Sequence, residues 1–168
     1  MIFLINFLII LTVPIIQASF MPFLKIFHVV PELALVVVII WSILAGFKKS
    51  IFWALGFGII LDIFSGVNFG FFSISFLLVA FLTDFFVTTI FDKQDIFSVG
   101  TLVFVLTIIT NIALVLVNRI SIASFYKPLL IDLLVVIILN IILALLLFPL
   151  FRRLNSWFLK FSSNIKLT

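Results

Sequence analysis

Cysteine is absent from this 168-residue chain, and His28 is its single histidine. The chain therefore forms no disulfide and offers no thiolate nucleophile or thiolate metal ligand. One histidine cannot build a metal site alone, so we expect no bound metal. Charged residues make up only 10% of the sequence, and the longest polar-containing stretch outside the apolar segments is the tail from Arg152 to Thr168. These shortages leave no room for a soluble domain.

Most of the sequence consists of apolar residues. They make up 66% of the chain, and the mean hydropathy is +1.56, whereas soluble domains are about half apolar and about a quarter charged. A membrane-spanning helix needs roughly 20 apolar residues. The sequence therefore predicts an all-α integral membrane protein with one domain of six transmembrane helices. The expected spans are about 2–23, 31–47, 50–65, 71–91, 96–117 and 128–151, followed by an amphipathic cytoplasmic tail over 152–168.

Basic residues at the ends of these spans predict the orientation in the membrane. One side would receive seven of them, namely Lys48, Lys49, Lys93, Arg152, Arg153, Lys160 and Lys166. The other side would receive Lys25, Arg119 and Lys127. Since cytoplasmic loops carry the excess of Lys and Arg, both termini are expected in the cytoplasm. This distribution fits an anionic membrane leaflet better than nucleic acid.

The segment GFGIILDIFSGVNFG, from Gly56 to Gly70, holds four of the six glycines and an acid within an apolar helix. We expect the other helices to pack around it, through a small and polar face that lets another backbone approach closely. The residues assigned to partner binding or helix packing are Ala54, Gly58, Asp62, Ser65, Gly66 and Gly70. Two interpretations of Asp62 stay open. In the first, its carboxylate accepts hydrogen bonds from backbone N–H groups around residues 65–70. In the second, it faces a partner helix or a small ligand.

Three other residues are assigned structural roles. Pro31 suits the first turn of the second helix, Asn140 lies mid-span in the last helix, and Pro149 lies near its end. No catalytic constellation is found. The Gly-x-Gly-Asp pattern of intramembrane aspartyl proteases is missing, because Asp62 follows Gly58 by four positions. No glycine loop suited to phosphate is followed by a lysine. The sequence therefore predicts neither an enzyme nor a cofactor.

The order of these segments resembles the MreD family of bacterial rod shape-determining membrane proteins. Within the glycine-containing helix that ends in Leu-Asp, the matching residues are Gly56, Gly58, Leu61, Asp62, Ser65, Gly66 and Gly70. The stretch NIILALLLFPLFRRL, from Asn140 to Leu154, resembles the last helix of the family in its Asn, its late proline and its basic end.

The resemblance implies a non-enzymatic scaffold in the cytoplasmic membrane that serves the cell-elongation machinery. Members pair with the single-span protein MreC and work with peptidoglycan synthases and the MreB cytoskeleton. The implied fold is similar to the substrate-binding S component of energy-coupling-factor vitamin transporters. A vitamin-binding S component is therefore the alternative function, although the first helix lacks the small-xxx-small face by which such proteins meet their transport partner. A third possibility, an intramembrane hydrolase, lacks its catalytic residues.

Overall fold

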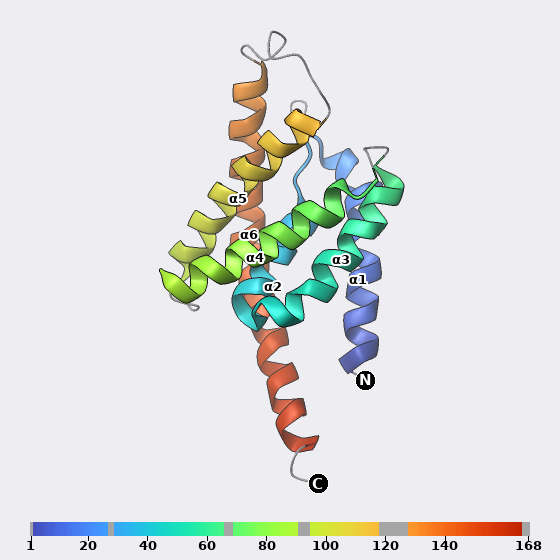
Figure 1. Cartoon of the computed structure of the whole chain (residues 1–168), viewed down its shortest axis with the longest axis vertical. Coiled ribbons are helices and arrows are strands. Elements are labelled where there is room, and N and C mark those ends of the chain that lie inside the picture. Colours follow the sequence, from blue (N-terminus) through green and yellow to red (C-terminus); the bar gives the residue numbers. More distant parts are fainter. Residues whose placement is uncertain (1, 27–28, 66–68, 91–94, 118–127, 166–168) are drawn as a thin grey trace.

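The computed structural model describes residues 2–26, 29–65, 69–90, 95–117 and 128–165, and within these ranges the chain is almost entirely helical. The α-helices are α1 (Ile2–Ser19), α2 (Leu33–Ala45), α3 (Phe47–Phe64), α4 (Phe71–Thr89), α5 (Ile96–Val117) and α6 (Pro128–Ile165) (Figure 1). A short 3₁₀ helix, η1 (Met21–Leu24), follows α1. The prediction of an all-α protein is confirmed.

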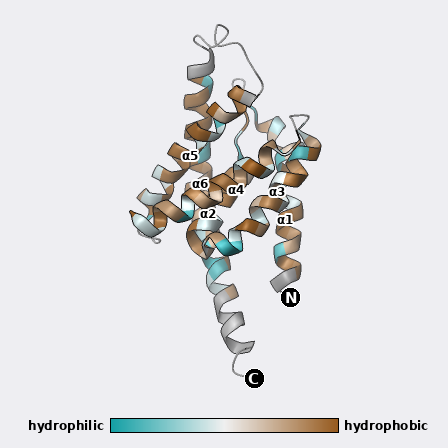
Figure 2. Cartoon of the chain, in the orientation of Figure 1, coloured by the Kyte–Doolittle hydropathy of each residue, from teal (hydrophilic) through white to brown (hydrophobic). Residues whose placement is uncertain are grey.

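Three of these helices are long and apolar enough to cross a membrane. Their apolar parts are Phe71–Thr89, Ile96–Leu116 and Ile131–Phe158. Apolar residues predominate along the helices (Figure 2), and many large apolar side chains are exposed. Within the described residues, α1 and α2 are apolar but shorter, and α3 carries Lys48, Lys49 and Asp62. The molecule is an all-α membrane protein, while the crossing of all six helices stays a prediction.

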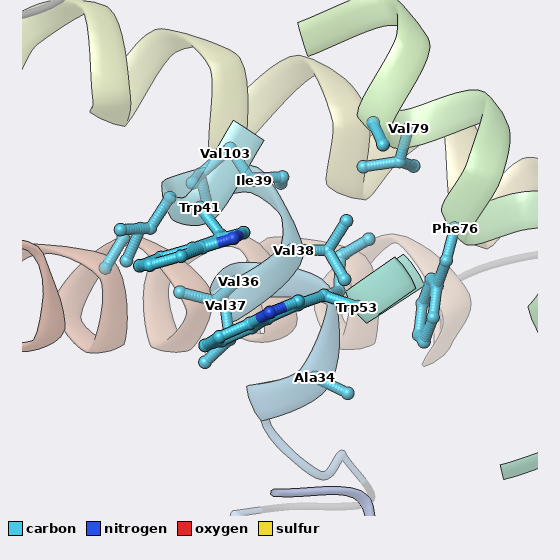
Figure 3. Packing of buried hydrophobic residues seen from close by; sticks show 14 of the residues in the cluster. Ala34, Val36, Val37, Val38, Ile39, Trp41, Trp53, Phe76, Val79 and Val103 are labelled. Atoms are coloured by element: carbon cyan, nitrogen blue, oxygen red, sulfur yellow. The ribbon is translucent and has the colours of Figure 1, made fainter. Parts of the chain in front are cut away.

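The centre of the molecule is α2. Every residue from Leu33 to Ile43 is buried, and α2 contacts each of the five other α-helices. A helix that is hydrophobic on all sides is stable only when other helices surround it. The valine and isoleucine run of α2 meets this description, and Figure 3 shows these side chains packed with Phe76, Val79 and Val103 from neighbouring helices.

The expectation that the Gly56–Gly70 segment forms this centre was wrong. One side of α3 is open to the surroundings, where Phe52, Ile59 and Ile63 are exposed. The opposite side, with Ala54, packs against the rest of the bundle. Because α3 has one small-residue face and a charged first turn, it is suited to the periphery, whereas the uniformly apolar α2 is suited to the centre.

The last helix is longer than the sequence predicts. The helix α6 passes through Pro149, Arg152 and Arg153 without interruption and ends at Ile165, so the helix does not end near Phe151 as expected, while the end of the membrane span there stays a prediction. Arginine is a good helix former, and neither glycine nor proline follows Pro149. The change from apolar to charged residues alters the polarity of the helix surface without breaking the backbone hydrogen bonds. The placement of the tail on a membrane surface stays a prediction, and residues 166–168 lie outside the described ranges.

Aromatic rings hold the extended part of α6 against the bundle. Trp41 of α2 and Trp53 of α3 stack with ring centroids 4.3 Å apart and an interplanar angle of 11° (Figure 3). Phe151 and Phe158 of α6 meet Trp41 edge-on, with centroid distances of 6.3 and 5.8 Å. In addition, the Asn155 side chain donates a 3.1 Å hydrogen bond to the carbonyl of Leu44, near the end of α2. The extension is thus part of the folded bundle at least as far as Phe158.

Candidate functional site

Asp62 caps the start of α4. One carboxylate oxygen, Oδ1, accepts the backbone N–H of Phe72 at 2.8 Å. The other, Oδ2, accepts the backbone N–H of Ser73 at 3.1 Å and its hydroxyl at 2.6 Å. The side chain is only 4% exposed. Asp62 therefore satisfies two helix N-terminal donors that have no intrahelical partner. These donors lie two to three residues beyond the segment 65–70 in which the sequence placed them.

The small residues on the same face of α3 allow α4 to approach. Ala54 and Gly58 are both buried. A Cβ atom built on Gly58 would overlap the Cα of Ser73, and it would lie 2.6 Å from the Ser73 nitrogen and 3.0 Å from the carbonyl carbon of Phe72. Only a residue without a side chain fits at this position. Gly58 and Asp62 therefore make an internal contact with α4, and Ala54 is buried on the same face of α3.

A second aspartate makes the reverse connection at the other end of the same pair of helices. Asp84, near the end of α4, accepts the backbone N–H of Phe47 at 3.1 Å, where α3 begins. The preceding residue, Gly46, has a φ of +79°, which favours glycine. Asp62 and Asp84 thus each cap the helix that the other belongs to, and we call the two contacts the reciprocal caps. The pair is held at opposite ends of the α3–α4 hairpin, and it does not form a catalytic dyad.

The remaining predicted residues of the segment lie at the turn between α3 and α4. Ser65 is exposed and follows the last residue of α3. Gly70 precedes α4 with a φ of +96°, in the left-handed region that glycine adopts without strain. Gly66 lies outside the described residues. The structure therefore places Gly58 and Asp62 against α4, buries Ala54 on the same face of α3 and leaves Ser65 at the surface.

Sequence reasoning missed a second polar site, at the start of α2. Glu32 precedes α2, and its backbone N–H donates to Oδ1 of Asn140 at 2.8 Å. The Nδ2 group of Asn140 donates to Oε2 of Glu32 and to the hydroxyl oxygen of Thr107, each at 3.1 Å. Asn140 is fully buried, and all of these bonds are internal. They connect α2, α5 and α6, and the bonds between Glu32 and Asn140 join residues 108 positions apart in the sequence.

Two further amides complete this site. Gln17 of α1 donates to the carbonyl of Pro31 at 3.1 Å and accepts the backbone N–H of Ala34 at 3.4 Å. The Nδ2 group of Asn111 lies 3.5 Å from Oε1 of Glu32 and donates to the carbonyl of Thr107 at 2.9 Å. We call Gln17, Glu32, Thr107, Asn111 and Asn140 the Glu32 cluster. It brings residues from α1, α5 and α6 to the start of α2.

The signals for this cluster were visible in the sequence only one residue at a time. Gln17, Asn111 and Asn140 are isolated polar residues in apolar helices, and such residues tend to face the bundle interior. Pro31 was expected within the first turn of α2, but α2 begins at Leu33, and Pro31 contributes its carbonyl to Gln17 instead. Pro149 lies inside α6, and the helix continues beyond it.

A cavity of about 40 Å³ adjoins the Glu32 cluster. Gln17 and Glu32 form part of its polar lining, together with Ser75 and Thr110. The aromatic rings of Phe71, Phe72 and Phe76, from the first turns of α4, also line it. The part of α4 that Asp62 caps is therefore the part that lines this cavity together with Glu32.

Comparison with known proteins gives one match. Residues 1–156 match the model of the family described as rod shape-determining protein MreD. No curated protein and no solved structure matches the chain. The expected similarity to transporter S components therefore stays a prediction. Since the family match covers the six helices almost completely, including the Asp62 segment and the Asn140–Leu154 stretch, this chain belongs to the MreD family of rod shape-determining proteins.

Proposed function

We propose that this chain is a non-enzymatic scaffold subunit of the bacterial cell-elongation machinery. It pairs with the single-span membrane protein MreC and supports peptidoglycan synthesis, and it reaches the synthases and MreB indirectly. The family match over residues 1–156 carries this proposal, because the role of that family is to determine rod shape.

The hydrogen bonds that the polar side chains make between helices support a structural role for this protein. Asp62 and Asp84 accept backbone N–H groups at helix starts, and Asn140 and Asn155 bond to other helices. Each of these side chains holds one helix to another. A scaffold needs a surface of constant shape for its partner, and such contacts between helices provide it.

The face of Ala54, Gly58 and Asp62 supports partner binding indirectly, because its contact with α4 fixes the shape of the α3–α4 hairpin. Because α4 covers this face, an MreC span meets the α3–α4 hairpin from another side. Substitutions at Gly58 then weaken MreC binding only as far as they disturb the hairpin itself. The membrane is the bacterial cytoplasmic membrane, and both termini lie in the cytoplasm, as the seven-to-three distribution of basic residues favours.

Copurification tests this function. The tagged chain is expressed with MreC, extracted in a mild detergent and passed through affinity and size-exclusion columns. We expect MreC to elute with the chain in one monodisperse peak, whereas an unrelated single-span protein expressed at the same level is lost. A monodisperse chain that never retains MreC would contradict the proposal. A vitamin that copurifies in place of MreC would favour the S-component alternative.

A further inference from the structure

The cavity beside Glu32 has the dimensions of a small ligand site. It offers about 40 Å³, and a water molecule needs about 10–15 Å³ by this measure, so it admits roughly three water-sized groups. Its walls come from several helices and from the segment before α2. Glu32 lines this space and is only partly buried.

The carboxyl group of Glu32 has no ionic partner in the part of the chain that the structure describes. Its two carboxylate oxygens accept from Asn140 and, at the longer distance of 3.5 Å, from Asn111, and both donors are neutral amides. A carboxylate has about four acceptor positions, so two remain. The N-terminus of α2 supplies about half a positive charge. When ionised, Glu32 therefore gives the cavity a net negative charge.

The aromatic side chains that line the cavity determine which kind of cation it suits. Phe71 and Phe72 meet edge-to-face with centroids 5.3 Å apart, and Phe72 and Phe76 lie 5.9 Å apart. Ring faces attract organic cations but coordinate no metal ion. Hard metal ions require about six to eight oxygen ligands, and the described residues include no group of three His, Cys, Asp or Glu side chains. A carboxylate and aromatic rings that line the same cavity are suited to an ammonium group.

We propose that this cavity binds a primary ammonium group carrying one or two carbons, with Glu32 as its counter-ion. The ammonium donates to the free acceptor positions of Glu32, and its methylene groups contact the phenylalanine rings. The ethanolamine headgroup of a membrane phospholipid and free ethanolamine share this chemistry. This site is separate from the proposed pairing with MreC and can be tested on the purified chain alone.

Thermal unfolding in a detergent free of phosphatidylethanolamine tests the site. Ethanolamine hydrochloride is expected to raise the Tm of the chain in a saturable manner. Sodium chloride at equal ionic strength and ethylene glycol, the uncharged analogue, are expected to leave it unchanged. Glu32→Gln removes the charge and should abolish the shift. Asp95→Asn is the matched control, because it removes an exposed carboxylate away from the cavity and should preserve the shift.

A second variant keeps the test decisive if Glu32→Gln does not fold. Ser75→Leu fills the cavity from α4 without changing any residue of the Glu32 cluster, and we expect it to weaken ethanolamine binding by about tenfold or more. In nanodiscs, stabilisation by phosphatidylethanolamine over phosphatidylcholine identifies the lipid as the source, and stabilisation by free ethanolamine alone identifies the soluble amine. The proposal is overturned if neither source stabilises the native chain, or if sodium chloride gives an equal shift.

Discussion

At the residue scale, the starts of α2, α3 and α4 are capped by side chains from other helices. The residues in the N-cap positions of α2, α3 and α4 are Glu32, Gly46 and Gly70, and none of them makes a side-chain cap hydrogen bond. The acceptors come instead from Gln17, Asp84 and Asp62. An unsatisfied backbone group in a membrane costs several kcal/mol. Each cap therefore also holds two helices in register.

The reciprocal caps predict an asymmetry between two otherwise identical substitutions. Asp62 uses both oxygens, so Asp62→Asn would present an amide N–H to a backbone donor and should destabilise the fold by about 1–3 kcal/mol. Asp84 accepts the Phe47 N–H through one oxygen, which an asparagine still provides, so Asp84→Asn should cost less than about 1 kcal/mol. SDS titration of the purified variants measures both. Equal losses of stability would contradict these assigned roles.

At the element scale, the α3–α4 hairpin depends on the closeness of its two backbones. Gly58 lies against the backbone of Ser73, which cannot move aside as a flexible side chain can. In a membrane, helices associate through such packing, because lipid offers no hydrophobic drive between them.

Gly58→Ala tests this contact with the smallest possible addition. We expect a loss of about 1–3 kcal/mol, because the new methyl group overlaps the α4 backbone. Gly100→Ala is the control, since a Cβ there meets nothing within 4 Å, and it should be neutral or stabilising by up to about 1 kcal/mol through helix propensity. Both are measured by SDS titration. If Gly58→Ala proved as neutral or stabilising as Gly100→Ala, helix propensity and not the close approach would govern Gly58.

The extension of α6 depends on one aromatic side chain more than on its neighbour. Phe158 is 8% exposed and packs edge-on against Trp41, whereas Trp157 is 38% exposed. Phe158→Ala should therefore release the extension and speed tryptic cleavage at Arg152 and Arg153, while Trp157→Ala should have a smaller effect. Limited proteolysis followed by mass spectrometry compares the rates. Faster cleavage in Trp157→Ala than in Phe158→Ala would show that the bundle contact does not protect the extension.

At the scale of the whole molecule, the start of α1 and the end of α6 point toward the same end of the bundle (Figure 1). The bond between Asn155 and Leu44 brings the extension of α6 to the corner where α2 ends and α3 begins. The exposed Lys48 and Lys49 follow that corner, and Arg152 and Arg153 precede Asn155. Basic residues distant in sequence thus gather at one end of the bundle, as expected of the cytoplasmic side.

Single-cysteine labelling tests this orientation without background, because the chain contains no cysteine. Phe23→Cys introduces a thiol at a position that is 83% exposed, beyond α1. Ser156→Cys introduces one at an exposed position in the α6 extension. A membrane-impermeant maleimide applied to spheroplasts should label the Phe23→Cys variant only, and lysis should make the Ser156→Cys variant reactive. The reverse pattern would place the termini outside the cytoplasm.

Much of this protein was determined by the sequence alone. Hydropathy predicts the six helices, the membrane and the all-α fold, because the cost of inserting a segment is a sum over its own residues. The Gly56–Gly70 motif and the Asn140–Leu154 stretch indicate the family, because both are continuous in the sequence. The carboxylate of Asp62 and the absence of a side chain at Gly58 also mark a close helix contact from residue type and spacing.

Only the tertiary structure decided which groups meet. The partner of Asp62 is the start of α4, the partner of Glu32 lies 108 residues away on α6, and the surrounded helix is α2 and not α3. Helices that are apolar on nearly every side carry little periodic contrast, so their sequences do not reveal which face is inside. An isolated Asn or Gln indicates that a hydrogen bond exists but not to which atom, because that depends on how all the helices pack at once.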